Sequence, residues 1–150
     1  MKVLVFHIGP DRYCLRLTAI ARVLPVASLK AIALAPPFVA GLLDLHGEPV
    51  PVIDLSRLAG VVPEQIWFDT RIILADYRLG SGATACLGLL AEHVIGVEAI
   101  DPPALRDSGV TGAPFLGQVA STAHGMMQLI EVDQLLPAEV RSLLFPQATA

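Results

Sequence analysis

Residues 37–55 read PFVAGLLDLHGEPVPVIDL, and this stretch contains two apolar segments separated by a short polar turn. The first segment, 38–45, is predicted to form a short helix or a strand. The second, 49–55, is predicted to be a strand because Val, Ile and Leu suit a pleated, half-buried surface. Pro49 and Pro51 lie two residues apart, so both missing N–H groups fall on the same side of that strand. A central strand does not tolerate this, and we therefore expect an edge strand or a bulged strand.

Short apolar runs separated by Gly and Pro continue on both sides of this stretch. The chain contains 12 glycines and 12 prolines, and turn signals recur about every 8–12 residues, as in a sandwich or a barrel. One helix is expected at about 137–145, where Pro137 suits the first turn and Val140, Leu143 and Leu144 share a face. Strands are predicted at residues 3–8, 12–17, 20–26, 49–55, 70–76, 83–91, 94–100, 115–121 and 126–132.

These elements predict the fold class and the number of domains. Strands dominate, and long helices do not alternate with them, which argues against a βαβ fold. A chain of 150 residues has the length of one ordinary domain. We therefore expect a single domain over 1–150 that is all-β, or mainly β with a C-terminal helix.

Composition argues against several classes of function. The net charge is -4 without a basic cluster, which argues against nucleic-acid binding. No apolar run reaches the roughly 18 residues of a membrane span, so we expect no direct membrane insertion. The N-terminus has no small-residue cleavage site and does not resemble a signal peptide. Cys14 and Cys86 are expected to be reduced, buried thiols of a cytoplasmic protein.

Patterns that carry catalytic or metal chemistry are absent from the sequence. There is no G-x-S-x-G turn and no glycine-rich loop that opens a helix to hold phosphate. Cys14 lies beside Arg12 and Arg16, yet a buried structural thiol is expected there. We predict no enzyme activity, no cofactor and no metal site. The histidines lack metal-ligand spacing with one another or with cysteine; they are His7, His46, His93 and His124.

The stretch 37–55 closely resembles the signature of CheW-type chemotaxis coupling (adaptor) proteins. That signature combines a proline and an aromatic residue, a glycine, an Asn-Leu-Arg-Gly-like turn and a Pro-Val-Ile-Asp-Leu-like strand. The resemblance extends upstream to residues 5–9 and Tyr13, and downstream to 94–97 and 127–136. The matching positions in the central stretch are Pro37, Phe38, Gly41, Leu45, Gly47, Pro51, Val52, Asp54 and Leu55.

The resemblance implies a fold and a mechanism. The fold would be a single CheW-like domain over 1–150, made of two intertwined, SH3-like, five-stranded barrels packed around a shared apolar core. The protein would be a cytoplasmic adaptor, recruited to membrane-associated receptor arrays. It would couple a CheA-type histidine kinase to the cytoplasmic tip of a methyl-accepting chemoreceptor without performing chemistry itself.

Two positions depart from the family pattern. His46 replaces the usual Arg of the turn, and Arg22 stands where the family often carries Glu. Arg offers an always-charged fork, whereas His is mostly neutral at pH 7. Because like-charge contacts penalise wrong partners, we expect dedicated partners in an alternative chemosensory pathway.

The residues predicted to face the kinase or the receptor are Ile20, Arg22, Leu24, Phe38, Gly41, His46 and Gly47. Simple core packing is an equal alternative for Ile20, Leu24 and Phe38. Two other functions remain open at this point. One is a regulatory module that binds a kinase or a response regulator without a receptor. The other is an enzyme with a shallow site that uses Cys14 or a histidine.

Overall fold

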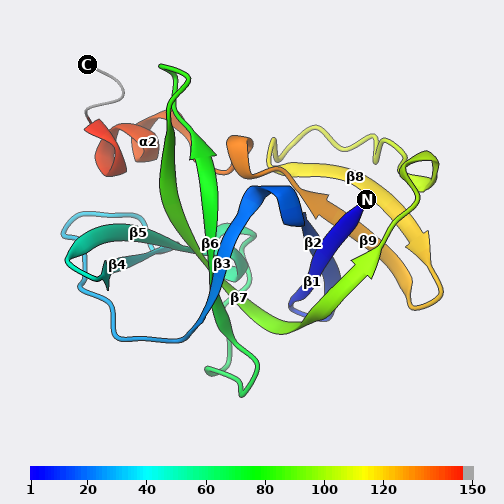
Figure 1. Cartoon of the computed structure of the whole chain (residues 1–150), viewed down its shortest axis with the longest axis horizontal. Helices are drawn as coiled ribbons and strands as arrows, with labels where there is room; N and C mark the ends of the chain where they lie inside the picture. Colours follow the sequence, from blue (N-terminus) through cyan, green and yellow to red (C-terminus); the bar gives the residue numbers. More distant parts are fainter. Residues whose placement is uncertain (147–150) are drawn as a thin grey trace.

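The computed structural model describes residues 1–146 and shows a mostly β protein with a short C-terminal helix (Figure 1). Short 3-10 turns follow β2, β7 and β9. The longer elements are β1 (Lys2–Ile8), β2 (Asp11–Arg16), β3 (Ile20–Pro25), β4 (Val39–Leu45), β5 (Glu48–Asp54), α1 (Leu55–Leu58), β6 (Arg71–Arg78), β7 (Thr84–Ala99), β8 (Leu116–Thr122), β9 (Gly125–Ile130) and α2 (Ala138–Leu144). Within this range no helix combines the length and the apolar character needed to cross a membrane.

The strands form two groups that share the long strand β7. The first strand group has the order β7-β1-β2-β9-β8, and the second has the order β3-β6-β7-β5-β4. The N-terminal part of β7 pairs with β6 and β5, and the part from Glu92 onward pairs with β1. Figure 1 shows the second group at the left and the first at the right, joined by β7.

Each group is closed by a short backbone contact. Lys30, in the segment after β3, exchanges two hydrogen bonds with Leu42 of β4 at 2.9 and 2.7 Å. Arg106, in the segment after β7, does the same with Val119 of β8 at 2.9 and 2.8 Å. In the second group, the segment after β3 therefore lies against β4. In the first group, the segment after β7 lies against β8. The description of the groups as two barrels stays a prediction.

The pairing of β5 explains how this strand tolerates the missing N–H groups of Pro49 and Pro51. Because Leu42 bonds to Lys30, Pro51 opposite it on β5 belongs to a pair without hydrogen bonds. Its missing N–H therefore faces away from β4, and the ladder to β7 begins only at Val52. The edge prediction is right for Glu48–Pro51 and wrong for Val52–Asp54, which lies between β4 and β7. Of the two alternatives for 38–45, the strand is the one observed.

The apolar core lies mainly where the two groups meet. The largest cluster combines Phe6 of β1 with Ile53, Tyr77 and Leu89 of the second group, and with Leu135 ahead of α2. Two smaller clusters fill the individual groups, one around Val5 and Leu129 and the other around Val52 and Ile72. The second group therefore packs against the first through a shared core. At about 1.5–3 kcal/mol for each fully buried side chain, this core is the main stabilising term of the fold.

Two details of the predicted elements need correction. The strands expected at 83–91 and 94–100 are one strand, β7, because pairing with β1 continues at Glu92. Positive φ angles at His93 and Gly96, 48° and 140°, bend this strand between the groups. Helix α2 has nearly the predicted bounds, and Val140 is buried, but Leu143 is 42% exposed and does not share the buried face.

Candidate functional site

The first set of predicted partner residues lies on β3. Among the described residues, this strand pairs only with β6, so its other edge presents backbone groups that none of them pairs over most of its length. Arg22 is exposed, and its side chain forms no hydrogen bond or ion pair with the residues that the structure describes. An unpaired cation on an open edge strand is free to meet a partner.

The predicted apolar partner residues are half-buried and already have neighbours. Ile20 and Phe38 pack against the shared core, and Leu24 packs against the smaller core of the second group. Core packing, the alternative raised by the sequence, is therefore sufficient to explain these three positions. Their role as partner contacts stays a prediction.

Gly41 lies at a close approach between β4 and the segment after β3. It is buried with a φ of 145°, and a Cβ placed on it would lie 2.6 Å from the backbone oxygen of Lys30. A side chain would force this segment away and disrupt the Lys30–Leu42 hydrogen bonds. Gly41 thus has a clear structural role, and its part in partner binding stays a prediction.

His46 and Gly47 form the exposed two-residue turn between β4 and β5. Their φ angles are 52° and 90°, and positive values at both central positions are the requirement of a type I′ hairpin turn. The Asp44 carboxylate accepts a hydrogen bond from the Gly47 backbone N–H at 2.8 Å. The turn projects the His46 side chain into solvent. The predicted residues therefore fall on two exposed elements, the β3 edge and this turn, together with the half-buried Phe38 and the buried Gly41.

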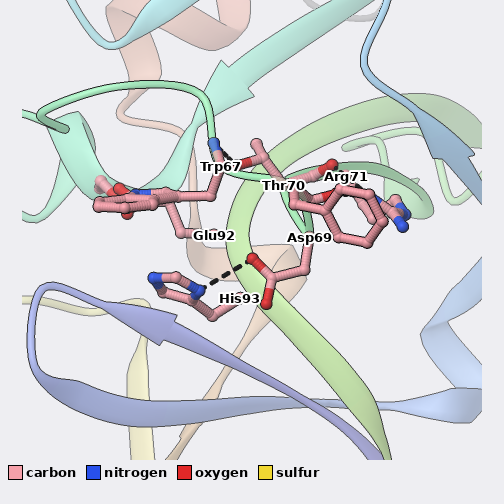
Figure 2. A network of polar contacts seen from close by, with 8 residues as sticks. Trp67, Asp69, Thr70, Arg71, Glu92 and His93 are labelled. Carbon is pink, nitrogen blue, oxygen red and sulfur yellow. Dashed lines mark hydrogen bonds and ion pairs between the residues drawn. The ribbon is translucent and has the colours of Figure 1, made fainter.

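A polar cluster that the sequence analysis missed joins α1, the loop before β6 and β7. Glu92 is buried, and both carboxylate oxygens are occupied: one accepts from Ser56 Oγ at 2.9 Å and the other from Trp67 Nε1 at 2.8 Å. Figure 2 shows Trp67 and Glu92 close together where the loop passes over β7. A buried carboxylate needs such donors because an unpaired charge is costly in an apolar setting.

The cluster continues at the bend of β7. His93 Nδ1 lies 2.8 Å from Asp69 Oδ1, as the dashed line in Figure 2 shows. The His93 ring also contacts the rings of Trp67 and of His7 on β1, with centroids 5.2 and 5.5 Å away. Burial lowers the pKa of His7, and the nearby His93 and Arg12 lower it further. The cluster therefore links the second strand group to β1 of the first.

The sequence offered one weak signal for this cluster. Trp67 is the only tryptophan, and a half-buried indole usually needs an acceptor for its N–H. The sequence around His93 gives no comparable signal. Its partner Asp69 lies 24 positions away, and the Ser56–Glu92 pair spans 36 positions, so no local pattern connects them.

Among the described residues, neither cysteine has a lowered pKa and no metal-binding group is present. Burial raises the pKa of Cys14 to about 12, so this thiol stays protonated and unreactive at neutral pH. Burial also raises the pKa of Asp54, which accepts hydrogen bonds from the backbone N–H groups of Ser56 and Arg57 and so caps α1. Across residues 1–146, no three His, Cys, Asp or Glu side chains are grouped to hold a metal ion.

Comparison with known proteins places the chain among the scaffold or adaptor proteins of chemotaxis. The model of the CheW-like domain matches residues 2–140, and the chain therefore belongs to the CheW-like domain family.

Individual relatives agree with this assignment over most of their length. The chemotaxis protein CheW of Bacillus subtilis (strain 168) is 21% identical, over 92% of this chain and 88% of the relative. CheW of Rhizobium meliloti (strain 1021) is also 21% identical, over 93% and 90%. The crystal structure of the scaffolding protein TtCheW from Thermoanaerobacter tengcongensis has a TM-score of 0.79 and 28% identity, over 89% of this chain and 90% of that one. This likeness confirms the mainly β fold and agrees with the expectation that the chain is not an enzyme.

Proposed function

We propose that the protein couples a CheA-type histidine kinase to the cytoplasmic tip of a methyl-accepting chemoreceptor. The observation that supports this most strongly is the CheW-like match over 2–140, together with the likeness to a solved scaffolding protein across 89% of the chain. The adaptor would be cytoplasmic and recruited to membrane-associated receptor arrays. Its mechanism would be structural: it positions the kinase relative to the receptor, so that a shift of the receptor changes kinase activity.

Two exposed elements support a binding role in this assembly. The open edge of β3 presents Arg22, and the β4–β5 turn presents His46 and Gly47. An edge strand and an exposed hairpin turn are common protein-binding devices. Ile20, Leu24 and Phe38 would then support these elements from below, with their exposed atoms at the margin of the contact, and the buried Gly41 would hold β4 close to the segment after β3.

Arg22 and His46 also support the proposal of dedicated partners in an alternative pathway. Both are exposed, so a partner can contact either of them. An adaptor with Glu at position 22 would repel an acidic group on the partner, whereas Arg22 attracts it. At position 46, His replaces an Arg that could bind a carboxylate through two hydrogen bonds, and this removes a charge-assisted contact.

Reconstitution from purified parts tests the proposal. The kinase and the receptor fragment from the same source are mixed with the adaptor, and sedimentation and kinase activity are measured. Coupling predicts a ternary complex and kinase activity that depends on receptor and adaptor together. Arg22→Glu and His46→Arg should lower affinity for these partners and raise it for an ordinary flagellar kinase–receptor pair. Binding to the kinase alone would instead identify a regulatory module, and binding to neither would refute the coupling role.

A further inference from the structure

A cavity lies where the turn between β1 and β2 meets the loop between α1 and β6. Its volume is about 290 Å³, close to the lower end of the roughly 300–1,000 Å³ of ligand sites, so it suits a small molecule. We refer to it as the Trp67 cavity, and the proposed coupling function does not use it. It is lined by Gly9 and Pro10 of the turn, by 61–64 and Trp67 of the loop, and by Glu92 and His93 of β7.

The two rings that line the Trp67 cavity are held in place by hydrogen bonds. Trp67 Nε1 donates to Glu92 at 2.8 Å, and His93 Nδ1 lies 2.8 Å from Asp69 Oδ1. The ring centroids are 5.2 Å apart with an angle of 37° between the planes, and Figure 2 shows the two rings beside each other. Because both rings are fixed before a ligand arrives, little conformational entropy is lost on binding.

The opposite side of the cavity is apolar and joins the two strand groups. The Val61 N–H donates to the Ser56 oxygen at 2.8 Å, which holds the start of the loop beside α1. A Cβ placed on Gly9 would lie 3.7 Å from Val61 Cγ1, so the loop and the β1–β2 turn approach each other closely. A ligand in the cavity would therefore contact the turn of the first group and the loop of the second.

The charges in the cavity favour a cation. Glu64 and Glu92 both line it, and no Lys or Arg is among its described lining residues. Glu64 is exposed, and its side chain forms no hydrogen bond or ion pair within the part of the chain that the structure describes. On the flanking elements, Arg12, Arg57 and Arg71 already interact with other groups. A small cation would thus find an unpaired carboxylate without a competing arginine.

The available acceptors favour a quaternary over a primary ammonium group. A primary ammonium carries three N–H donors, and a donor left unpaired away from water costs free energy. Both Glu92 oxygens already accept a hydrogen bond, so among the described carboxylates that line the cavity only Glu64 is free. A trimethylammonium group has no N–H to satisfy, and the face of a tryptophan ring is the aromatic surface that attracts such a cation best.

We propose that the Trp67 cavity binds a small trimethylammonium compound. The cationic head lies against the Trp67 indole, and Glu64 supplies the counter-charge. Glu92 positions the indole through its Nε1 bond. The site does not depend on the coupling function. Because a ligand that binds only the folded chain stabilises it by mass action, occupancy also raises the thermal midpoint.

Titration of the full chain with choline chloride tests the proposal. Trp67 is the only tryptophan, so its fluorescence reports directly on the cavity, and calorimetry gives the affinity. Sodium chloride at equal ionic strength is the salt control. Two further probes are ethanolamine, a primary ammonium, and the uncharged analogue of choline in which a tert-butyl group replaces trimethylammonium. Choline should give a saturable change, and each of the other two probes should bind about tenfold or more weakly.

Substitutions at Glu64 assign the binding to this cavity. Glu64→Gln should weaken choline binding about 2–5-fold, the range expected for an exposed ion pair. Glu64→Lys should abolish it, because the tethered ammonium group takes the place of the ligand. Glu48→Gln and Glu48→Lys change another exposed glutamate and are the matched controls, which should bind choline like the wild type. Thermal midpoints without ligand check that all four variants remain folded.

Four results would overturn the proposal. The first is a wild type on which choline has no effect beyond that of sodium chloride. The second is an uncharged analogue that binds as tightly as choline, which would show that charge is not recognised. The third is ethanolamine binding more tightly than choline, and the fourth is a Glu64→Lys variant that binds choline like Glu48→Lys. None of these results bears on kinase or receptor binding, so the coupling function is tested separately.

Discussion

Gly41 and Gly47 lie in the same hairpin, yet a methyl group has different consequences at the two positions. At Gly41 the new Cβ would meet the Lys30 backbone at 2.6 Å, whereas at Gly47 it would meet open space. We predict that Gly41→Ala lowers the free energy of unfolding by about 3 kcal/mol. Gly47→Ala, which suffers only the strain of a positive φ, should lose about 1 kcal/mol. Urea unfolding of both variants checks this, and equal losses would contradict the role given to the Lys30 contact.

His7 gives the stability of the protein a predictable dependence on pH. Its folded pKa lies below the ordinary 6.5 because of burial, with His93 and Arg12 adding to the effect. Between the folded value and 6.5 the unfolded chain binds more protons than the native one, so stability rises with pH across this window and falls as pH is lowered through it. The negative charges of Asp11 and Asp69 partly oppose this lowering of the His7 pKa.

The His7→Gln variant tests this dependence. Its thermal midpoint should change less than that of the wild type between pH 7 and the lower end of the window. His124→Gln, in the exposed turn between β8 and β9, is the control and should leave the wild-type profile unchanged. A profile that is identical in all three proteins would refute the role of His7.

At the scale of elements, Glu92 ties α1 and the loop before β6 to β7 through Ser56 and Trp67. Trp67→Phe keeps most of the ring and removes one donor from this buried carboxylate. We predict a loss of about 1–3 kcal/mol in the free energy of unfolding, the penalty of an unsatisfied buried group. Ile66→Ala, at an exposed neighbour, should stay within about 0.5 kcal/mol. Chemical denaturation measures both, and a Trp67→Phe variant as stable as Ile66→Ala would contradict the prediction.

The sequence predicts an element well when the residues that determine it lie close together in the chain. The turn at His46–Gly47 and the helix after Pro137 were predicted because their signals lie within a few residues. The continuity of β7 was missed because it depends on His93 adopting a left-handed conformation, stabilised by the distant Asp69. The Glu92 cluster was missed for the same reason. The seven predicted site residues came from the family resemblance, and the structure adds which of them are exposed.

At the scale of the whole molecule, the shared core and the shared strand β7 predict one cooperative unit. Phe6 of the first group and Tyr77 of the second belong to the same buried cluster, so neither group can unfold and leave the other intact. We predict a single transition in which Trp67 fluorescence and far-UV circular dichroism change together. Hydrogen exchange should likewise give β1 and β6 equal maximal protection. Two separated transitions would show that the groups are independent.

Because β7 belongs to both strand groups, the chain order determines which binding surfaces can be transplanted from one adaptor to another. The second group is built from residues 20–91 without interruption, whereas the first uses residues 2–16 and the chain from Glu92 onward. One half is thus an insertion within the other, and it has only two covalent junctions, at the 3-10 turn Leu17–Ala19 and at the bend of β7. A chimera that transplants 20–91 from a relative would replace the β3 edge and the His46 turn in one step.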